Sequence, residues 1–62
     1  MKSIEELKEM TFNEIIEYFI TVKIKKEQLV KIIDECKIPL DENRHSKAYY
    51  SNRVADWLCK SG

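Results

Sequence analysis

The sequence has one glycine and one proline among its 62 residues. An all-β fold needs a turn every few residues, and these two residue types make many of those turns, so their scarcity argues against such a fold. No stretch approaches the ~20 apolar residues of a membrane span. The N-terminus, MKSIEELKEM, has no apolar run of the length found in a secretory signal. We therefore expect no membrane contact.

Soft metal ligands are also few. Cys36, His45 and Cys59 are the only candidates, and their spacing matches none of the paired patterns of zinc sites. Both cysteines fall on or beside predicted apolar stripes, where a free cysteine behaves as a small hydrophobic residue. With two cysteines and no export signal, we expect a reduced protein in the cytoplasm, although a disulfide between the two is an alternative. The sequence predicts no metal and no cofactor.

Enzyme motifs are absent as well. There is no G-x-S-x-G, no glycine-rich phosphate loop and no H-E-x-x-H. A chain this short has little room for a concave site of the size enzymes use. We therefore expect a non-enzymatic protein that acts by binding.

What the chain does have is enough apolar side chain for a core and many charges. Hydrophobic residues make up 44% and charged residues 35%, which predicts one small folded domain over residues 1–62. Net charge is zero but uneven. Residues 1–22 carry two lysines and five glutamates, a charge of −3, and residues 23–62 carry nine basic and six acidic side chains, a charge of +3.

Local signals predict an all-α fold, a small bundle of about four short helices. Capping boxes at Ser3–Glu6 and Thr11–Glu14 begin helices over about 4–10 and 12–22. A third helix begins near residue 25 and stops by about residue 37, because the residue before Pro39 is pushed away from helical angles. Ser46 caps the last helix, about 47–59. The predicted core consists of Phe12, Ile15, Ile16, Phe19, Leu29, Ile32, Ile33, Tyr50, Val54, Trp57 and Leu58.

The most specific functional hypothesis is DNA binding by the last helix. Two helices joined by a turn, the second with polar residues facing outward, have the outline of a helix-turn-helix transcription-regulatory domain. Asparagine and arginine pair with adenine and guanine through two hydrogen bonds, and lysines contact phosphates. The candidate DNA-binding residues are His45, Lys47, Tyr49, Asn52, Arg53, Lys60, Lys25 and Lys26.

Residues 34–58 also resemble the helix-turn-helix tail of serine recombinases in outline. An apolar helix end, a turn with Pro39, a basic loop and a helix capped by Ser46 follow one another in the same order. The resemblance covers less than half of the chain and lacks the glycine that those tails have before the turn. It implies DNA binding by the last helix and assigns no family.

The alternative hypothesis is a protein–protein interaction module, such as a small adaptor or inhibitor of the kind phages use. Its surface would be either the acidic N-terminal half or an exposed apolar patch at the end of the second helix, which could also form a homodimer. The candidate residues are Glu5, Glu9, Glu14 and Glu17 for the first surface, and Tyr18, Ile20, Val22 and Ile24 for the second.

Overall fold

Residues 2–61, which the computed structural model describes, form four α-helices and no strand. The helices are α1 (Ile4–Lys8), α2 (Phe12–Thr21), α3 (Lys26–Cys36) and α4 (Lys47–Ser61). The prediction of a small all-α bundle is confirmed. The predicted starts agree with the structure, whereas α1 ends at Lys8 rather than near Met10.

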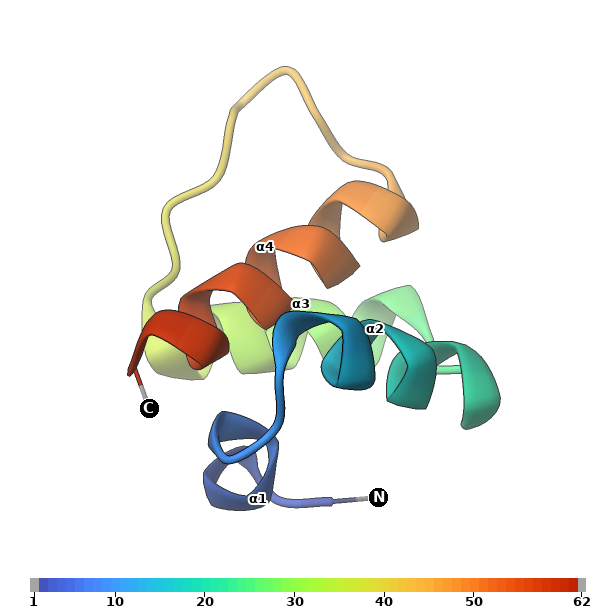
Figure 1. Ribbon diagram of the computed structural model, residues 1–62. Coiled ribbons are helices and arrows are strands. Elements are labelled where there is room, and N and C mark those ends of the chain that lie inside the picture. Colours follow the sequence, from blue (N-terminus) through green and yellow to red (C-terminus); the bar gives the residue numbers. More distant parts are fainter. Residues whose placement is uncertain (1, 62) are drawn as a thin grey trace.

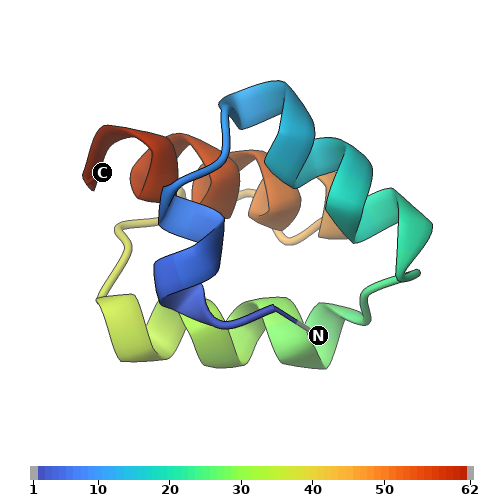
Figure 2. The same ribbon diagram turned by 60° about the horizontal axis from the view of Figure 1, so that its bottom comes forward.

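Helix α4 is the centre of the bundle, because α1, α2 and α3 each pack against it (Figure 1). Val54, Ala55 and Leu58 of α4 have no exposed surface. Viewed from below, α1 crosses between α2 and α3 on the side away from the long loop (Figure 2). A helix with neighbours on several sides has only a narrow face left for a ligand.

The helix starts follow the capping signals of the sequence. The Glu6 carboxylate accepts from the Ser3 N–H at 3.4 Å, and that of Glu14 accepts from the Thr11 N–H at 2.9 Å. Ser46 Oγ accepts from the Tyr49 N–H at 3.1 Å, which confirms the predicted cap of α4. Each of these contacts satisfies a backbone N–H that has no partner within its helix.

Helices α2 and α3 end in the same way, with a lysine in the left-handed conformation followed by a buried isoleucine. Lys23 has φ 52° and Lys37 has φ 54°. The Ile24 N–H donates to the Phe19 carbonyl at 3.1 Å, and the Ile38 N–H donates to the Ile33 carbonyl at 3.0 Å. These are the hydrogen bonds of a Schellman motif, in which glycine is the usual left-handed residue. Neither helix end has glycine at this position, and the buried isoleucine after the lysine anchors the motif instead.

After α3 the chain makes a long excursion over residues 37–46 before α4 begins (Figure 1). As a result α3 and α4 run in the same general direction, and α2 runs opposite to both (Figures 1 and 2). A helix-turn-helix joins its helices at a large angle through only about three or four residues. The connection in this protein is therefore of a different kind.

The core differs from the predicted one at several positions. Phe12 was expected in the core, but it is 36% exposed. It is the first residue of α2, one turn before the buried Ile15 and Phe19 stripe is fully covered by the other helices. Trp57 and Ile16 are half-buried and pack against the edge of the core. The buried core consists of Leu7, Ile15, Phe19, Ile24, Leu29, Ile32, Ile33, Ile38, Tyr50, Val54, Ala55 and Leu58.

Among residues 2–61, no helix combines the length and the apolar character needed to cross a membrane. Cys36 is half-buried and Cys59 is exposed, and both are free thiols. Cys59 was expected on or beside an apolar stripe, and it lies beside the buried Leu58 but is itself exposed.

Candidate functional site

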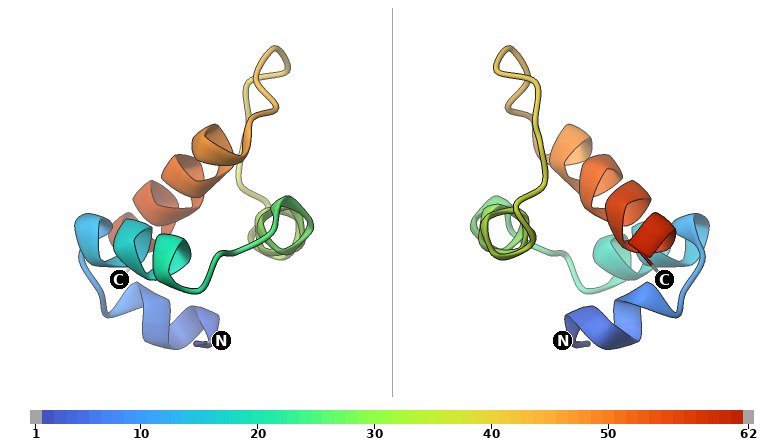
Figure 3. Two further views of the ribbon diagram at one scale, coloured as in Figure 1. Left: turned by 90° about the vertical axis from the view of Figure 1, so that its right-hand side faces the viewer. Right: turned by 90° about the vertical axis from the view of Figure 1, so that its left-hand side faces the viewer.

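The strongest candidate site is a groove between the second half of α2 and the first half of α4, here called the α2–α4 groove. The two helices are close together where α2 begins and diverge toward the end where α4 begins (Figure 3). The space between the diverging ends is an open hollow of about 530 Å³. Its lining residues are Ile16, Phe19, Ile20, Lys23, Ile24, Lys47, Ala48, Ser51 and Asn52.

The groove follows from the sizes of the side chains along it. On α2, Ile16, Phe19 and Ile20 recur at the spacing of one helix face. On α4 the facing residues include Ala48 and Ser51, which are too small to fill the space that the diverging helices leave. Ile20 is 70% exposed, more than any other large hydrophobic residue in the described part of the chain. The groove is thus lined largely by apolar side chains, and the Ile20 side chain on its α2 side is exposed to water.

Both charged residues that line the groove are lysines, Lys23 and Lys47. Both are exposed, and neither forms an ion pair within the described residues. Lys23 is the left-handed residue that ends α2, and Lys47 is the first residue of α4. The groove therefore carries positive charge that the rest of the described chain leaves unneutralised.

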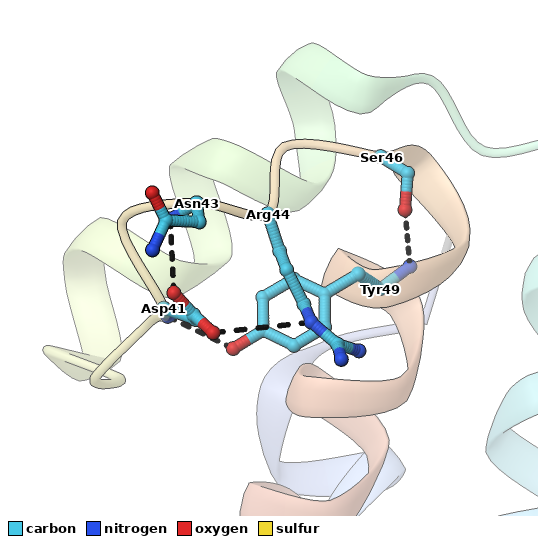
Figure 4. A network of polar contacts seen from close by, with 5 residues as sticks. All are labelled: Asp41, Asn43, Arg44, Ser46 and Tyr49. Carbon is cyan, nitrogen blue, oxygen red and sulfur yellow. Dashed lines mark hydrogen bonds and ion pairs between the residues drawn. The ribbon is translucent and has the colours of Figure 1, made fainter.

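Tyr49, a candidate DNA contact, is half-buried and holds the long loop in place. Its hydroxyl accepts from the Asp41 N–H at 2.9 Å, and the Arg44 guanidinium lies 5.7 Å from the centre of its ring. The Asp41 carboxylate in turn accepts from the Asn43 N–H and pairs with Arg44 (Figure 4). The expectation that Tyr49 points outward is wrong, because its ring and hydroxyl are both used by the loop.

Arg53, which was also expected to point outward, is half-buried as well. Its guanidinium donates to the Pro39 carbonyl at 3.2 Å and lies 3.9 Å from the Asp56 carboxylate. Lys60 pairs with the same carboxylate at 3.2 Å. These basic groups on α4 are therefore engaged with the protein itself, and Arg53 fastens the start of the long loop to α4.

The remaining five DNA candidates lie in three different places. His45 Nδ1 lies 3.2 Å from the Tyr50 hydroxyl, and Lys26 Nζ lies 5.4 Å from the centre of the Tyr50 ring, so both contact one core residue. Lys47 and Asn52 are exposed and line the α2–α4 groove. Lys25 is exposed at the start of α3. The structure thus does not bring the eight residues together on one surface.

The candidate apolar patch is smaller than the sequence predicted. Ile24 was expected to be exposed, but it is buried, because it is the anchoring isoleucine at the end of α2. Tyr18 is half-buried and its hydroxyl accepts from the Lys2 N–H. Ile20 and Val22 remain exposed. The signal that sequence reasoning missed is the Lys-Ile pair, which occurs again at the end of α3.

The acidic candidates lie on α1, at its C-cap and on α2. Glu5, Glu9 and Glu17 are exposed. Glu14 is exposed too, but its carboxylate accepts from the Thr11 N–H, and this hydrogen bond lowers the pKa of Glu14 from its ordinary value. Glu14 therefore has a structural role at the start of α2.

A second hollow, of about 440 Å³, lies between α1 and α3. Lys2, Lys31 and Glu35 line it together with Ile4, so its charges are mixed in sign and it presents less apolar surface than the α2–α4 groove. Among residues 2–61, no three histidine, cysteine, aspartate or glutamate side chains gather closely enough to hold a metal ion. The α2–α4 groove differs from this second hollow in that it presents more apolar surface and carries charge of one sign.

Comparison of this chain with models of protein families, with curated proteins and with solved structures finds no match in any of the three.

Proposed function

We propose that this protein is a non-enzymatic interaction module, a small adaptor or inhibitor that binds a partner protein in the α2–α4 groove. The observation that carries the proposal is the exposure of Ile20 beside a groove whose floor is already apolar. An exposed apolar surface costs free energy in water, and its burial against a partner recovers that free energy.

DNA binding by α4 has less support. A recognition helix needs side chains free to reach base edges. Tyr49 and Arg53 bond to the long loop, and Lys60 pairs with Asp56. Lys47 and Asn52, which are exposed on α4, adjoin an apolar hollow that a phosphate backbone would not fill.

A photo-crosslinking residue at position 20 tests the proposal. We expect the protein with this residue in place of Ile20 to capture a partner protein in cells that make the chain. The matched control carries the same residue at Val30, which is 45% exposed on α3 and lines neither hollow. The capture at position 20 should survive nuclease treatment, and the control should not give the same product.

A groove-filling variant makes the test specific. Ala48→Trp places a large side chain in the groove from an exposed position, so we expect it to abolish the capture at position 20 without unfolding the bundle. Val30→Trp is the control for added bulk and should leave the capture unchanged. A capture that persists in Ala48→Trp, or that needs nucleic acid, would contradict the proposal.

A further inference from the structure

We infer that the occupant of the α2–α4 groove is an amphipathic helix of a partner protein, with apolar side chains on one face and carboxylates beside them. This inference rests on the proposed function and specifies the chemistry of the partner. It follows from the shape of the groove, from the sign of its charge and from the absence of an acidic residue in its lining.

The shape favours a helix as the occupant. Both walls are helices, and a hollow between two diverging helices accepts the side-chain ridge of a third. Ile16, Phe19 and Ile20 lie in about the last two turns of α2, and Lys23 follows just after its end. A ligand helix of similar length could place residues i, i+3 or i+4 and i+7 along the floor. A partner strand has no strand to pair with, since residues 2–61 form no strand.

The charge favours acidic residues on that helix. Lys23 and Lys47 come from the two walls, one at the end of α2 and one at the start of α4. Most other basic groups near α4 are already engaged, since Arg53 and Lys60 share Asp56 and Lys26 lies over Tyr50. Carboxylates that flank the apolar face of a partner helix would meet Lys23 and Lys47, neither of which forms an ion pair within residues 2–61.

The same residues disfavour the two other occupants. In a two-fold dimer the same patch lies on both sides of the interface, so the lysines of both copies would meet with no carboxylate among the lining residues. A nucleic acid would bring phosphates to Lys23 and Lys47, but it would leave the exposed Ile20 and the half-buried Ile16 without an apolar partner. An acidic amphipathic helix satisfies both the apolar floor and the two lysines.

Two synthetic helical peptides test the inference. Both have leucine at i, i+3, i+4 and i+7. One has glutamate at the flanking positions, and the other has lysine. We expect the glutamate peptide to shift the amide signals of Ile16, Ile20, Ala48 and Ser51 in NMR titrations, and the lysine peptide to bind about tenfold more weakly, from ion pairs of ordinary exposed strength. Equal binding of the two peptides would overturn the inference.

A charge-reversed variant provides the complementary test. Lys23→Glu combined with Lys47→Glu should exchange the preference, so that the lysine peptide becomes the tighter ligand. The control is Lys37→Glu, which has the same left-handed conformation at the end of α3 but does not line the groove. It should keep the original preference. If the double variant still prefers the glutamate peptide, the lysines do not select the partner.

Two further measurements separate the other occupants. Light scattering should give a monomeric mass at concentrations where the glutamate peptide saturates, because a dimer would cover the groove with a second copy. Duplex DNA should leave the signal of Ile20 unshifted, and a shift there that fades with added salt would favour nucleic acid instead. If the two peptides bind equally while the crosslink at position 20 still captures a partner, the acidic partner helix is ruled out but the proposed function is not. Loss of that capture would overturn the function itself.

Discussion

Helices α2 and α3 are built alike at both ends, yet the chain leaves them in different ways. Each begins with a backbone N–H that donates to the side chain three residues on, from Thr11 to Glu14 and from Lys25 to Gln28. Each ends in a left-handed lysine and a buried isoleucine. After Ile24 the next residue, Lys25, is already the N-cap of α3, whereas after Ile38 the chain continues through a long loop.

The difference lies in the residue that follows the isoleucine. Lys25 serves as the N-cap of α3, and its N–H donates to the Gln28 side chain at 3.0 Å. Pro39 has no N–H and pushes Ile38 away from helical angles. The loop then bonds to α4 through the Pro39 carbonyl and the Asp41 N–H. The buried isoleucine therefore sets where each helix ends, and the residue after it determines whether a new helix or a loop follows.

The largest effect should come from removing the two anchoring isoleucines. Ile24→Ala and Ile38→Ala should each lower the free energy of unfolding by about 2–5 kcal/mol, the usual cost of a cavity left by a buried isoleucine. We expect Ile24→Ala to cost more, because the tight connection between α2 and α3 cannot shift to fill the cavity, whereas the long loop after Ile38 can. Urea denaturation followed by circular dichroism measures both. A larger loss for Ile38→Ala would contradict the comparison.

A smaller and opposite effect should come from the two left-handed lysines. A residue with a Cβ atom in this conformation costs about 1–2 kcal/mol relative to its preferred region, and glycine avoids that cost. Lys37→Gly and Lys23→Gly should therefore each raise the free energy of unfolding by about 1 kcal/mol. Thermal melts of the two variants measure the gain.

Lys23→Gly and Lys37→Gly should differ in peptide binding, even though we expect both to gain the same stability. Lys23 lines the α2–α4 groove and Lys37 does not, so only Lys23→Gly should weaken the glutamate peptide described above. The expected loss is about threefold, the strength of one exposed ion pair. Equal peptide affinity for the two variants would show that Lys23 has no part in binding.

The smallest expected effect is that of acidic pH on the starts of α2 and α3. The hydrogen bond from the Thr11 N–H lowers the pKa of Glu14 below its ordinary value of 4.5. The ionised form is thus the one that stabilises α2, so its contribution is complete above that ordinary value and is lost as the pH falls through the lowered pKa. Gln28 does not titrate, so the start of α3 should not respond.

Amide chemical shifts between about pH 6 and pH 3 would measure this difference directly. The Thr11 N–H should move as the Glu14 carboxylate is protonated, while the Lys25 N–H should stay in place. In Glu14→Gln both amides should be insensitive to pH, because the two helix starts then have the same neutral acceptor. A Thr11 N–H that titrates in this variant would assign the effect to another group.

The sequence was sufficient to locate the helices, but only part of the candidate site. Lys47 and Asn52 were predicted as DNA contacts and Ile20 as part of a protein-binding patch, and all three line the groove. The grouping of the other DNA candidates could not be predicted, because the Tyr49 hydroxyl and the Arg53 guanidinium each form a hydrogen bond with the long loop, which no helical pattern records. The burial of Ile24 was missed, since the helical stripe of α2 ends before it and only the left-handed Lys23 turns it into the core.

The sequence by itself determined the all-α class and the starts of the helices, because a cap is a hydrogen bond between residues about three apart and needs no distant partner. The tertiary structure alone decided that α4 is the central helix, and that α2 and α4 diverge. Both depend on how Val54, Ala55 and Leu58 pack against several helices at once. The α2–α4 groove exists because Ala48 and Ser51 cannot fill the space between the two helices, and no local pattern in the chain records that space.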